Sequence, residues 1–169
     1  MKRYAVRILG TAVLLIAIDQ LIKLWVLAEL KGKPPILLLG PITESSNTDL
    51  LRFVFVSNSG AAFGLGENLT LIISAIAIAV VIGLIRWSFK VADPVWAVAV
   101  TLLLGGAAGN LIDRLLQPPS PLRGHVVDFI SVGSFPVFNF ADICITLAAF
   151  TLVVATLTKR DPEGVDGSR

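Results

Sequence analysis

The sequence predicts an all-α membrane protein with four transmembrane helices and a small β-sheet or hairpin on the outer (periplasmic) side. Of its 169 residues, 55% are hydrophobic and only 15% are charged. A soluble domain of this length has too much surface to hide so many apolar side chains, whereas a bilayer solvates them directly. The apolar residues also form four runs, each long enough to cross about 30 Å of hydrocarbon, which takes roughly 20 helical residues. These runs are residues 8–28, 69–87, 95–112 and 135–158.

The first run follows three basic residues, as a cleavable signal peptide would. Asp19, Gln20 and Lys23 interrupt it, and the apolar character then resumes with no small-residue cleavage pattern. We therefore expect an uncleaved helix. Because Asp19 and Lys23 are four positions apart, they can form an internal ion pair, and we assign all three polar residues a structural or supporting role.

Lysine and arginine residues predict the orientation of the chain, because they concentrate in cytoplasmic loops. Most of those that flank the four runs lie on one side if the helices alternate in direction. They are Lys2, Arg3, Arg7, Arg86, Lys90, Lys159 and Arg160. Both termini are then cytoplasmic, residues 29–68 and 113–134 face outward, and residues 1–160 form a single membrane domain. Residues 161–169 are polar without apolar periodicity, which predicts a flexible cytoplasmic tail.

The outer segment after the first helix is too long for a simple turn. Residues 35–39 and 51–56 are rich in aliphatic, β-branched and aromatic side chains, and Gly40 and Pro41 begin the polar stretch between them. This pattern is typical of two short strands. We expect them to form the small sheet or hairpin on the outer membrane surface.

Composition argues against several kinds of site. Cys144 is the only cysteine, so no internal disulfide can form, and His125 is the only histidine, so a multi-histidine metal site cannot be built. The net charge of +2 is small and the basic residues are spread along the chain, which argues against nucleic-acid binding. We expect no metal and no cofactor.

Asp128 and Asp142 are the strongest indication of chemistry. A carboxylate in a hydrocarbon-facing segment costs roughly 2.5 to 3.5 kcal/mol, so it persists mainly where it is shielded and useful. If the last helix starts at Phe135, Asp142 lies about 10 Å inward at 1.5 Å per residue. The loop before that helix can carry Asp128 back over Asp142. Two carboxyl groups held close share a proton, as an aspartic hydrolase requires to activate water and protonate a carbonyl oxygen.

Polar residues at the end of the third helix could support such a pair. Asn110, Asp113 and Arg114 follow a small-residue stretch that allows another helix to approach closely. Their three- and four-residue spacings place them on one side of a continuing helix. Alternatively, the charged residues simply meet lipid headgroups at a helix end.

Asn139 precedes Asp142 by three positions, which would place both on one face of the last helix. Asn58 and Gly60 begin the run that leads from the expected sheet to the second helix, where a substrate backbone could approach. An ordinary glycine-rich turn is an equally good explanation of that run.

Five ordered runs resemble one known family, the bacterial lipoprotein signal peptidases, also called signal peptidase II. The runs are DQLIK at residues 19–23, NSGAAFG at residues 58–64, GGAAGNLIDR at residues 105–114, VVDF at residues 126–129 and FNFAD at residues 138–142. One departure is a proline-rich link, LLQPPSPLR, at residues 115–123, which is longer than is usual in that family.

The resemblance implies an aspartic endopeptidase of the bacterial inner membrane that removes signal peptides from diacylglyceryl-modified prolipoproteins, cutting before the lipidated cysteine. Asp128 and Asp142 would be the catalytic pair, active near the outer face and without a cofactor. The resemblance also implies globomycin as an inhibitor, contact with membrane lipids, and a monomer. The residues that shape the site or hold substrate would be Asn58, Gly60, Asn110, Asp113, Arg114 and Asn139.

Two other functions remain open from the residues alone. A small polytopic carrier or channel subunit could use Asp19, Asp113 and Asp142 as proton relays, but its charges should spread through the membrane depth. Here Asp19 and Lys23 are the only pair expected to lie apart from the others. An assembly factor without chemistry would tolerate amide replacements of Asp128 and Asp142.

Overall fold

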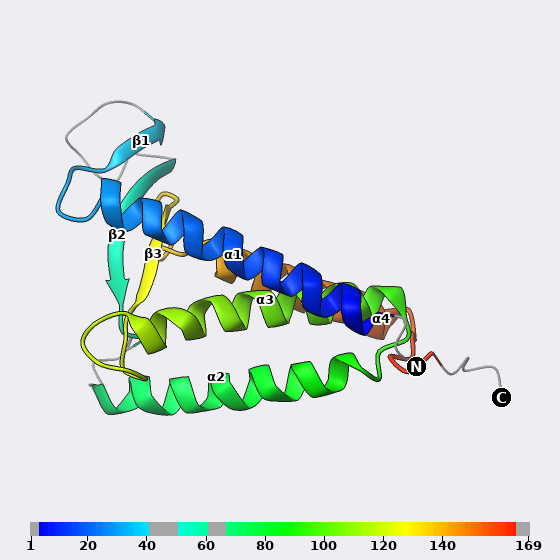
Figure 1. Cartoon of the computed structure of the whole chain (residues 1–169). Helices are drawn as coiled ribbons and strands as arrows, with labels where there is room; N and C mark the ends of the chain where they lie inside the picture. Colours follow the sequence, from blue (N-terminus) through cyan, green and yellow to red (C-terminus); the bar gives the residue numbers. More distant parts are fainter. Residues whose placement is uncertain (1–3, 41–50, 61–66, 165–169) are drawn as a thin grey trace.

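The computed structural model describes residues 4–40, 51–60 and 67–164. Four helices are long and apolar enough to cross a membrane, as predicted. They are α1 (Ala5–Glu29), α2 (Glu67–Ser88), α3 (Pro94–Leu116) and α4 (Phe140–Leu157). The helices run along a common direction, with a small sheet at one end of the bundle and both termini at the other (Figure 1).

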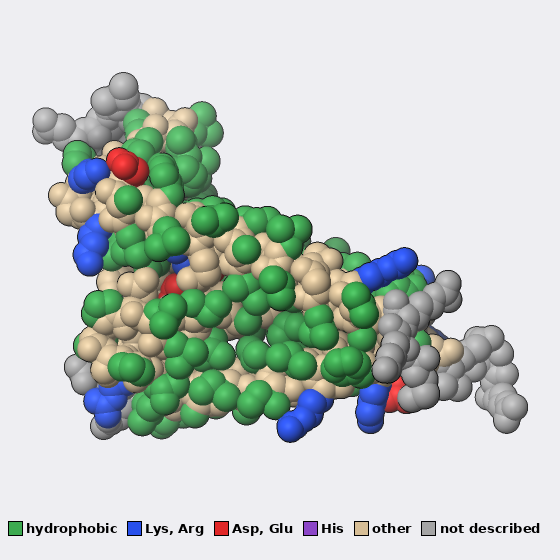
Figure 2. All heavy atoms as spheres, viewed as in Figure 1, with side chains coloured by type: hydrophobic (Ala, Val, Ile, Leu, Met, Phe, Trp, Pro, Cys, Tyr) green, Lys and Arg blue, Asp and Glu red, His purple; other side chains and the backbone are tan. Residues whose placement is uncertain are grey.

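The surface of the bundle suits a lipid environment. Large apolar side chains stand exposed along the helices, among them Val6, Ile72 and Phe150. Hydrophobic atoms cover the length of the bundle, whereas most Lys and Arg side chains lie toward its two ends (Figure 2). Such a surface is unfavourable in water and favourable in hydrocarbon.

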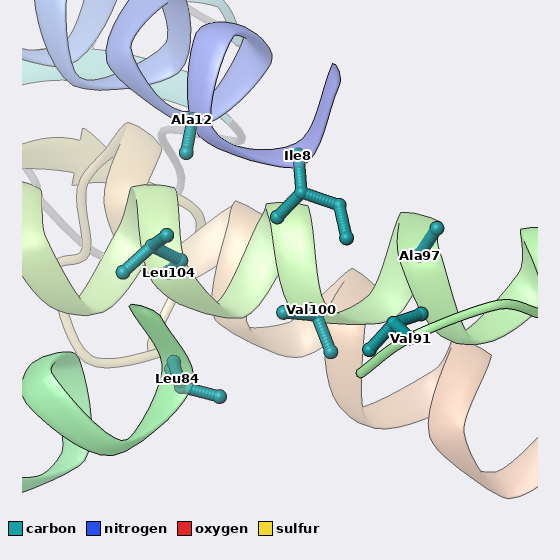
Figure 3. Packing of buried hydrophobic residues seen from close by; sticks show 7 residues of the cluster. All are labelled: Ile8, Ala12, Leu84, Val91, Ala97, Val100 and Leu104. Carbon is teal, nitrogen blue, oxygen red and sulfur yellow. The ribbon is translucent and has the colours of Figure 1, made fainter. Parts of the chain in front are cut away.

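Helix α3 lies at the centre of the bundle because small residues let other helices approach it. A Cβ atom added to Gly106 would lie 2.5 Å from the backbone oxygen of Ala141 in α4, and one on Gly105 would lie 2.9 Å from Cβ of Leu15 in α1. The predicted close approach of helices at this stretch is therefore present. At the end with the termini, α1, α2 and α3 share an apolar core (Figure 3). Its buried members are Ile8, Ala12, Leu84, Val91, Ala97, Val100 and Leu104.

The sheet has three antiparallel strands in the order β1 (Ile36–Leu39), β2 (Leu51–Asn58) and β3 (Val126–Ser131). The two predicted strands are present, and β3 adds a third. A second apolar cluster, which contains Val26, Leu30, Val127 and Phe129, joins one face of the sheet to the end of α1. Because side chains alternate along a strand, Asp128 projects from the opposite face of β3.

The last helix begins at Phe140 and not at residue 135 as predicted. Pro136 interrupts the run, and Phe138 exchanges backbone hydrogen bonds with Ile130 of β3, which holds these residues extended. Asn139 then caps the helix with an extended backbone. Asp142 therefore lies in the first turn of α4, and the predicted depth of about 10 Å inside the helix is wrong.

The other helices run slightly beyond their predicted bounds. Helix α1 starts at Ala5, α2 at Glu67, and α3 continues to Leu116, so that Asp113 and Arg114 are helical as expected. At the other end of the bundle, the backbone oxygen of Pro162 accepts a hydrogen bond from the N–H of Ala92 (2.8 Å). The rest of the predicted tail, residues 165–169, lies outside the described residues.

Candidate active site

Asp128 and Asp142 meet at the sheet end of the bundle, and Asn139 joins them. Asn139 Nδ2 donates to Asp128 Oδ1 (2.6 Å), and the Asn139 backbone N–H donates to Asp142 Oδ2 (3.1 Å). Asp128 is buried on β3, whereas Asp142 is partly exposed at the start of α4. Two carboxyl groups fourteen positions apart in sequence therefore share one bridging residue.

Two further amides complete the environment of these carboxyl groups. Asn58 Nδ2 donates to Asp128 Oδ2 (2.7 Å), and Asn110 Nδ2 donates to Asp142 Oδ1 (2.9 Å). Each of the four carboxyl oxygens thus accepts an N–H from a described residue. Amide donors hold the orientation of a carboxyl group without adding a charge that would neutralise it.

The start of α4 sets the position of Asp142. Asn139 Oδ1 accepts from the Asp142 backbone N–H (3.0 Å), which with the reciprocal bond to Asp142 Oδ2 forms a capping box. The backbone N–H groups of the first turn of α4, which have no acceptor within the helix, also lie at this end. Asn139 is therefore the helix cap and is not on the helical face where its spacing from Asp142 had placed it.

Burial is the main influence on Asp128. It raises the pKa of Asp128 to about 6, the hydrogen bonds from Asn58 and Asn139 act in the opposite direction, and the nearby charge of Asp142 raises the pKa further. Asp128 therefore retains its proton to a higher pH than an ordinary aspartate.

A groove of about 430 Å³ opens beside Asp142. Apart from Asp142 and Thr146, its lining is apolar. The lining residues are Phe135, Pro136, Val137, Phe138, Asp142, Ile143, Thr146 and Leu147. The groove can hold an apolar or extended chain against the exposed carboxyl group.

Gly60 and Arg114 support the Asn58 side of the site. The Gly60 N–H donates to Asn58 Oδ1 (2.8 Å), which turns the Asn58 amide nitrogen toward Asp128. Gly60 has a φ of +77°, and a Cβ there would lie 3.1 Å from Arg114 Nη2, so glycine suits both the turn and the contact. Arg114 is buried and its Nη1 donates to the Ser59 backbone oxygen (3.4 Å).

A buried ion cluster underlies the site. Lys23 Nζ lies 2.9 Å from Asp19 Oδ2, as the spacing predicted, and 2.8 Å from Asp113 Oδ2. Gln20 Nε2 donates to both of these aspartates. Asp113 therefore pairs with α1 and does not contact the Asp128–Asp142 pair directly.

The cluster also holds the elements of the site together. Asp113 Oδ2 accepts the backbone N–H of Val127 in β3 (3.0 Å), and Asp19 Oδ1 accepts that of Ala141 in α4 (3.1 Å). Lys23 Nζ donates to Asn110 Oδ1 (3.0 Å), so the cluster reaches the amide that binds Asp142. The expectation that Asp19 and Lys23 lie apart is wrong, although their place in the outer half of the helix was a usable signal.

The described residues contain no group of three or more His, Cys, Asp or Glu side chains arranged to hold a metal ion. These features define a class: a multi-pass membrane protein with two amide-bridged carboxyl groups at one end of a four-helix bundle.

Comparison with known proteins assigns the family. Residues 11–158 match the family model described as signal peptidase (SPase) II. The chain is 40% identical over 149 residues to the lipoprotein signal peptidase of Rhodococcus jostii (strain RHA1), covering 88% of this chain and 71% of that protein. It is 39% identical over 163 residues to that of Streptomyces griseus, covering 96% and 79%. The chain belongs to the signal peptidase II family.

Solved structures agree with this fold. Two of them, both described as a bacterial membrane enzyme structure by the in meso method, are 29% identical to this chain. Their TM-scores are 0.70 and 0.68, with 89% and 90% of this chain covered and 92% and 88% of theirs. The similarity therefore extends over nearly the whole bundle and its sheet.

Proposed function

We propose that this protein is an aspartic endopeptidase that removes signal peptides from diacylglyceryl-modified prolipoproteins and cuts before the lipidated cysteine. The observation that carries the proposal is the bridged carboxyl pair, in which Asn139 contacts both Asp128 and Asp142. Membership of the signal peptidase II family supports the substrate class.

The two carboxyl groups differ in a way that assigns their roles. Asp142 is partly exposed beside the groove and accepts two N–H groups, so it takes the role of the base. Asp128 is buried and has a raised pKa, so it is the acid. An apolar substrate bound in the groove would exclude water from the site and favour the protonated form of Asp128 further.

The reaction then needs no covalent intermediate. Asp142 takes a proton from a water molecule, and the hydroxide attacks the scissile carbonyl carbon while Asp128 gives its proton to the carbonyl oxygen. The resulting diol collapses as the C–N bond breaks. Asp142 returns its proton to the leaving cysteine nitrogen, and one hydroxyl of the diol returns a proton to Asp128.

The groove beside Asp142 suits the substrate of this reaction. A prolipoprotein presents a membrane-embedded signal segment and acyl chains, both of which are apolar and match the lining around Ile143 and Leu147. A carrier would place its carboxyl groups along a path through the bilayer. Asp19, Asp113, Asp128 and Asp142 instead gather in one connected cluster, which favours the enzyme.

The proposed location is the bacterial inner membrane, with both termini in the cytoplasm and the site near the outer face. The distribution of lysine and arginine supports this orientation, since Arg86, Lys90 and Arg160 lie at or beyond the helix ends near the termini. We further propose that the chain works as a monomer in contact with membrane lipids. Globomycin would inhibit it by occupying the site at Asp128 and Asp142.

A cleavage assay on purified protein tests the proposal. A diacylglyceryl-modified precursor and the same precursor without its lipid would be incubated separately, and the products mapped by mass spectrometry. We expect cleavage of the lipidated precursor immediately before the modified cysteine. Absence of cleavage, or a cut at another peptide bond, would overturn the proposed function.

A further inference from the structure

The ammonium group of Lys23 has a third partner besides its two carboxylates. Its side chain is 2% exposed, and Nζ contacts Asp19 Oδ2 (2.9 Å), Asp113 Oδ2 (2.8 Å) and Asn110 Oδ1 (3.0 Å). An ammonium has three N–H donors, and each is used. Two of them go to carboxylates, and the third goes to a neutral amide that itself binds Asp142.

The contacts of Asn110 allow only one orientation of its amide. Oδ1 accepts from Lys23 Nζ and from Asn139 Nδ2 (3.2 Å), while Nδ2 donates to Asp142 Oδ1 (2.9 Å). A rotation of the amide by a half-turn would place an NH₂ group against an ammonium and a second NH₂. It would also turn the Asn110 Oδ1 toward Asp142 Oδ1, which would then lose the amide donor that Asn110 supplies.

We propose that Lys23 is a positioning residue for the cleavage reaction, acting through Asn110. Its ammonium holds the Asn110 amide so that Nδ2 faces Asp142 and keeps this carboxyl group oriented for water activation. The inference rests on the proposed function of the Asp128–Asp142 pair. A lysine that only paired with Asp19 and Asp113 would influence stability without selecting the donor to Asp142.

The position of Lys23 separates its effect on turnover from an effect on binding. Lys23 is buried and is not among the residues that line the groove beside Asp142. Its loss should therefore lower kcat and leave KM nearly unchanged, because the substrate contacts persist while an interaction with the reacting carboxyl is lost. Losing a hydrogen bond to a charged group predicts a decrease in kcat of about 10- to 100-fold.

The double variant keeps the formal charge of the Lys23, Asp19 and Asp113 cluster equal to that of the unsubstituted protein. Lys23→Met alone would leave Asp19 and Asp113 buried without a cation, so it is combined with Asp19→Asn, which removes one opposite charge. The reference is Asp19→Asn alone, which retains Lys23 and its contact with Asn110. Turnover of the lipidated precursor is measured for both, and thermal unfolding in detergent verifies that each is folded.

Coupling to Asn110 is the decisive readout. In the Asp19→Asn background, Lys23→Met should lower kcat by about 10- to 100-fold with KM changed less than about twofold. When Asn110→Ala is also present, adding Lys23→Met should lower kcat by less than about twofold. The Asn110 amide, through which Lys23 acts on Asp142, is then already absent. Equal losses with and without Asn110→Ala, or a change confined to KM, would overturn the inference.

A second substitution of Lys23 covers the case in which the methionine variant is unstable. Should the methionine variant not fold, Lys23→Gln in the same background retains a polar side chain, and the same loss of kcat and the same coupling are expected. Additive losses in that series would again overturn the role of Lys23. Absence of cleavage by the unsubstituted protein would instead refute the proposed function, so the two failures are distinguishable.

Discussion

Replacement of Asn139 separates two tasks that this residue performs at once. Its Oδ1 caps α4 through the Asp142 N–H, and its Nδ2 donates to Asp128. Asn139→Ser keeps a cap oxygen but cannot reach Asp128, whereas Asn139→Ala loses both functions. The cap is worth about 1 kcal/mol of stability, so the alanine variant should be less stable than the serine variant by that amount.

The lost donor should affect both variants equally. Because Asp128 reacts as the protonated acid, the lost hydrogen bond is one to a neutral group and contributes about 0.5 to 1.5 kcal/mol, so kcat should fall by about 2- to 10-fold in each. Because the bond from Asn139 favours the ionised form of Asp128, its removal should raise the pKa of Asp128 above about 6 and move the basic limb of the pH profile upward.

The assays are turnover of a lipidated precursor as a function of pH and unfolding in detergent. Both variants lack the Asn139 side-chain amide, so each serves as the control for the other. If Asn139→Ser cleaves at the unsubstituted rate, the cap and not the donor to Asp128 is what matters, and the reasoning on the bridged pair is refuted.

Three other outcomes follow from the packing and the charges. Gly106→Ala should lower the free energy of unfolding by about 1 to 3 kcal/mol, because its Cβ would lie 2.5 Å from the Ala141 oxygen. The control is Gly83→Ala, which should be neutral or slightly stabilising because a Cβ at Gly83 would meet nothing within 4 Å. The pKa of Asp128 rises from 3.8 to about 6 on folding, so the folded state holds this proton more tightly and stability should fall by about 3 kcal/mol as pH rises from about 4 to 6. The share of this pH dependence that comes from Asp128 should be lost in Asp128→Asn when unfolding is measured against pH. Asp93 caps α3 through two backbone N–H groups, so Asp93→Ala should cost about 1 kcal/mol by denaturant titration, and an unchanged midpoint would contradict the cap.

The membrane helices could be predicted from sequence because a long apolar run has few stable arrangements other than a helix that spans the membrane. The start of α4 was misplaced because Phe135, Val137 and Phe138 continue the apolar run. Pro136 and Asn139 were the local signals of a later start. What decides the boundary is the pairing of Phe138 with Ile130, a contact between segments that hydropathy does not record.

The residues of the site likewise divide into those that the sequence predicts and those that only the packing of the helices reveals. Asp128 and Asp142 could be selected because carboxyl groups are costly in apolar segments. The link from Lys23 through Asn110 to Asp142 could not, because it depends on how closely α1 and α3 approach each other. A Cβ on Gly109 would lie 2.7 Å from Asp19 Oδ2, so the close approach of α1 and α3 requires glycine at position 109. The residue it faces, Asp19, lies ninety residues earlier in the sequence.

The most direct test of the account replaces each carboxyl group by its amide. Asp128→Asn and Asp142→Asn should each lower turnover of a diacylglyceryl-modified precursor by about 10²- to 10⁴-fold, the usual contribution of general acid–base catalysis, while the protein stays folded in detergent. Asp93→Asn, the same substitution at the far end of the bundle, should cleave at the unsubstituted rate. Cleavage at that rate by either Asp128→Asn or Asp142→Asn would contradict the assignment of the pair.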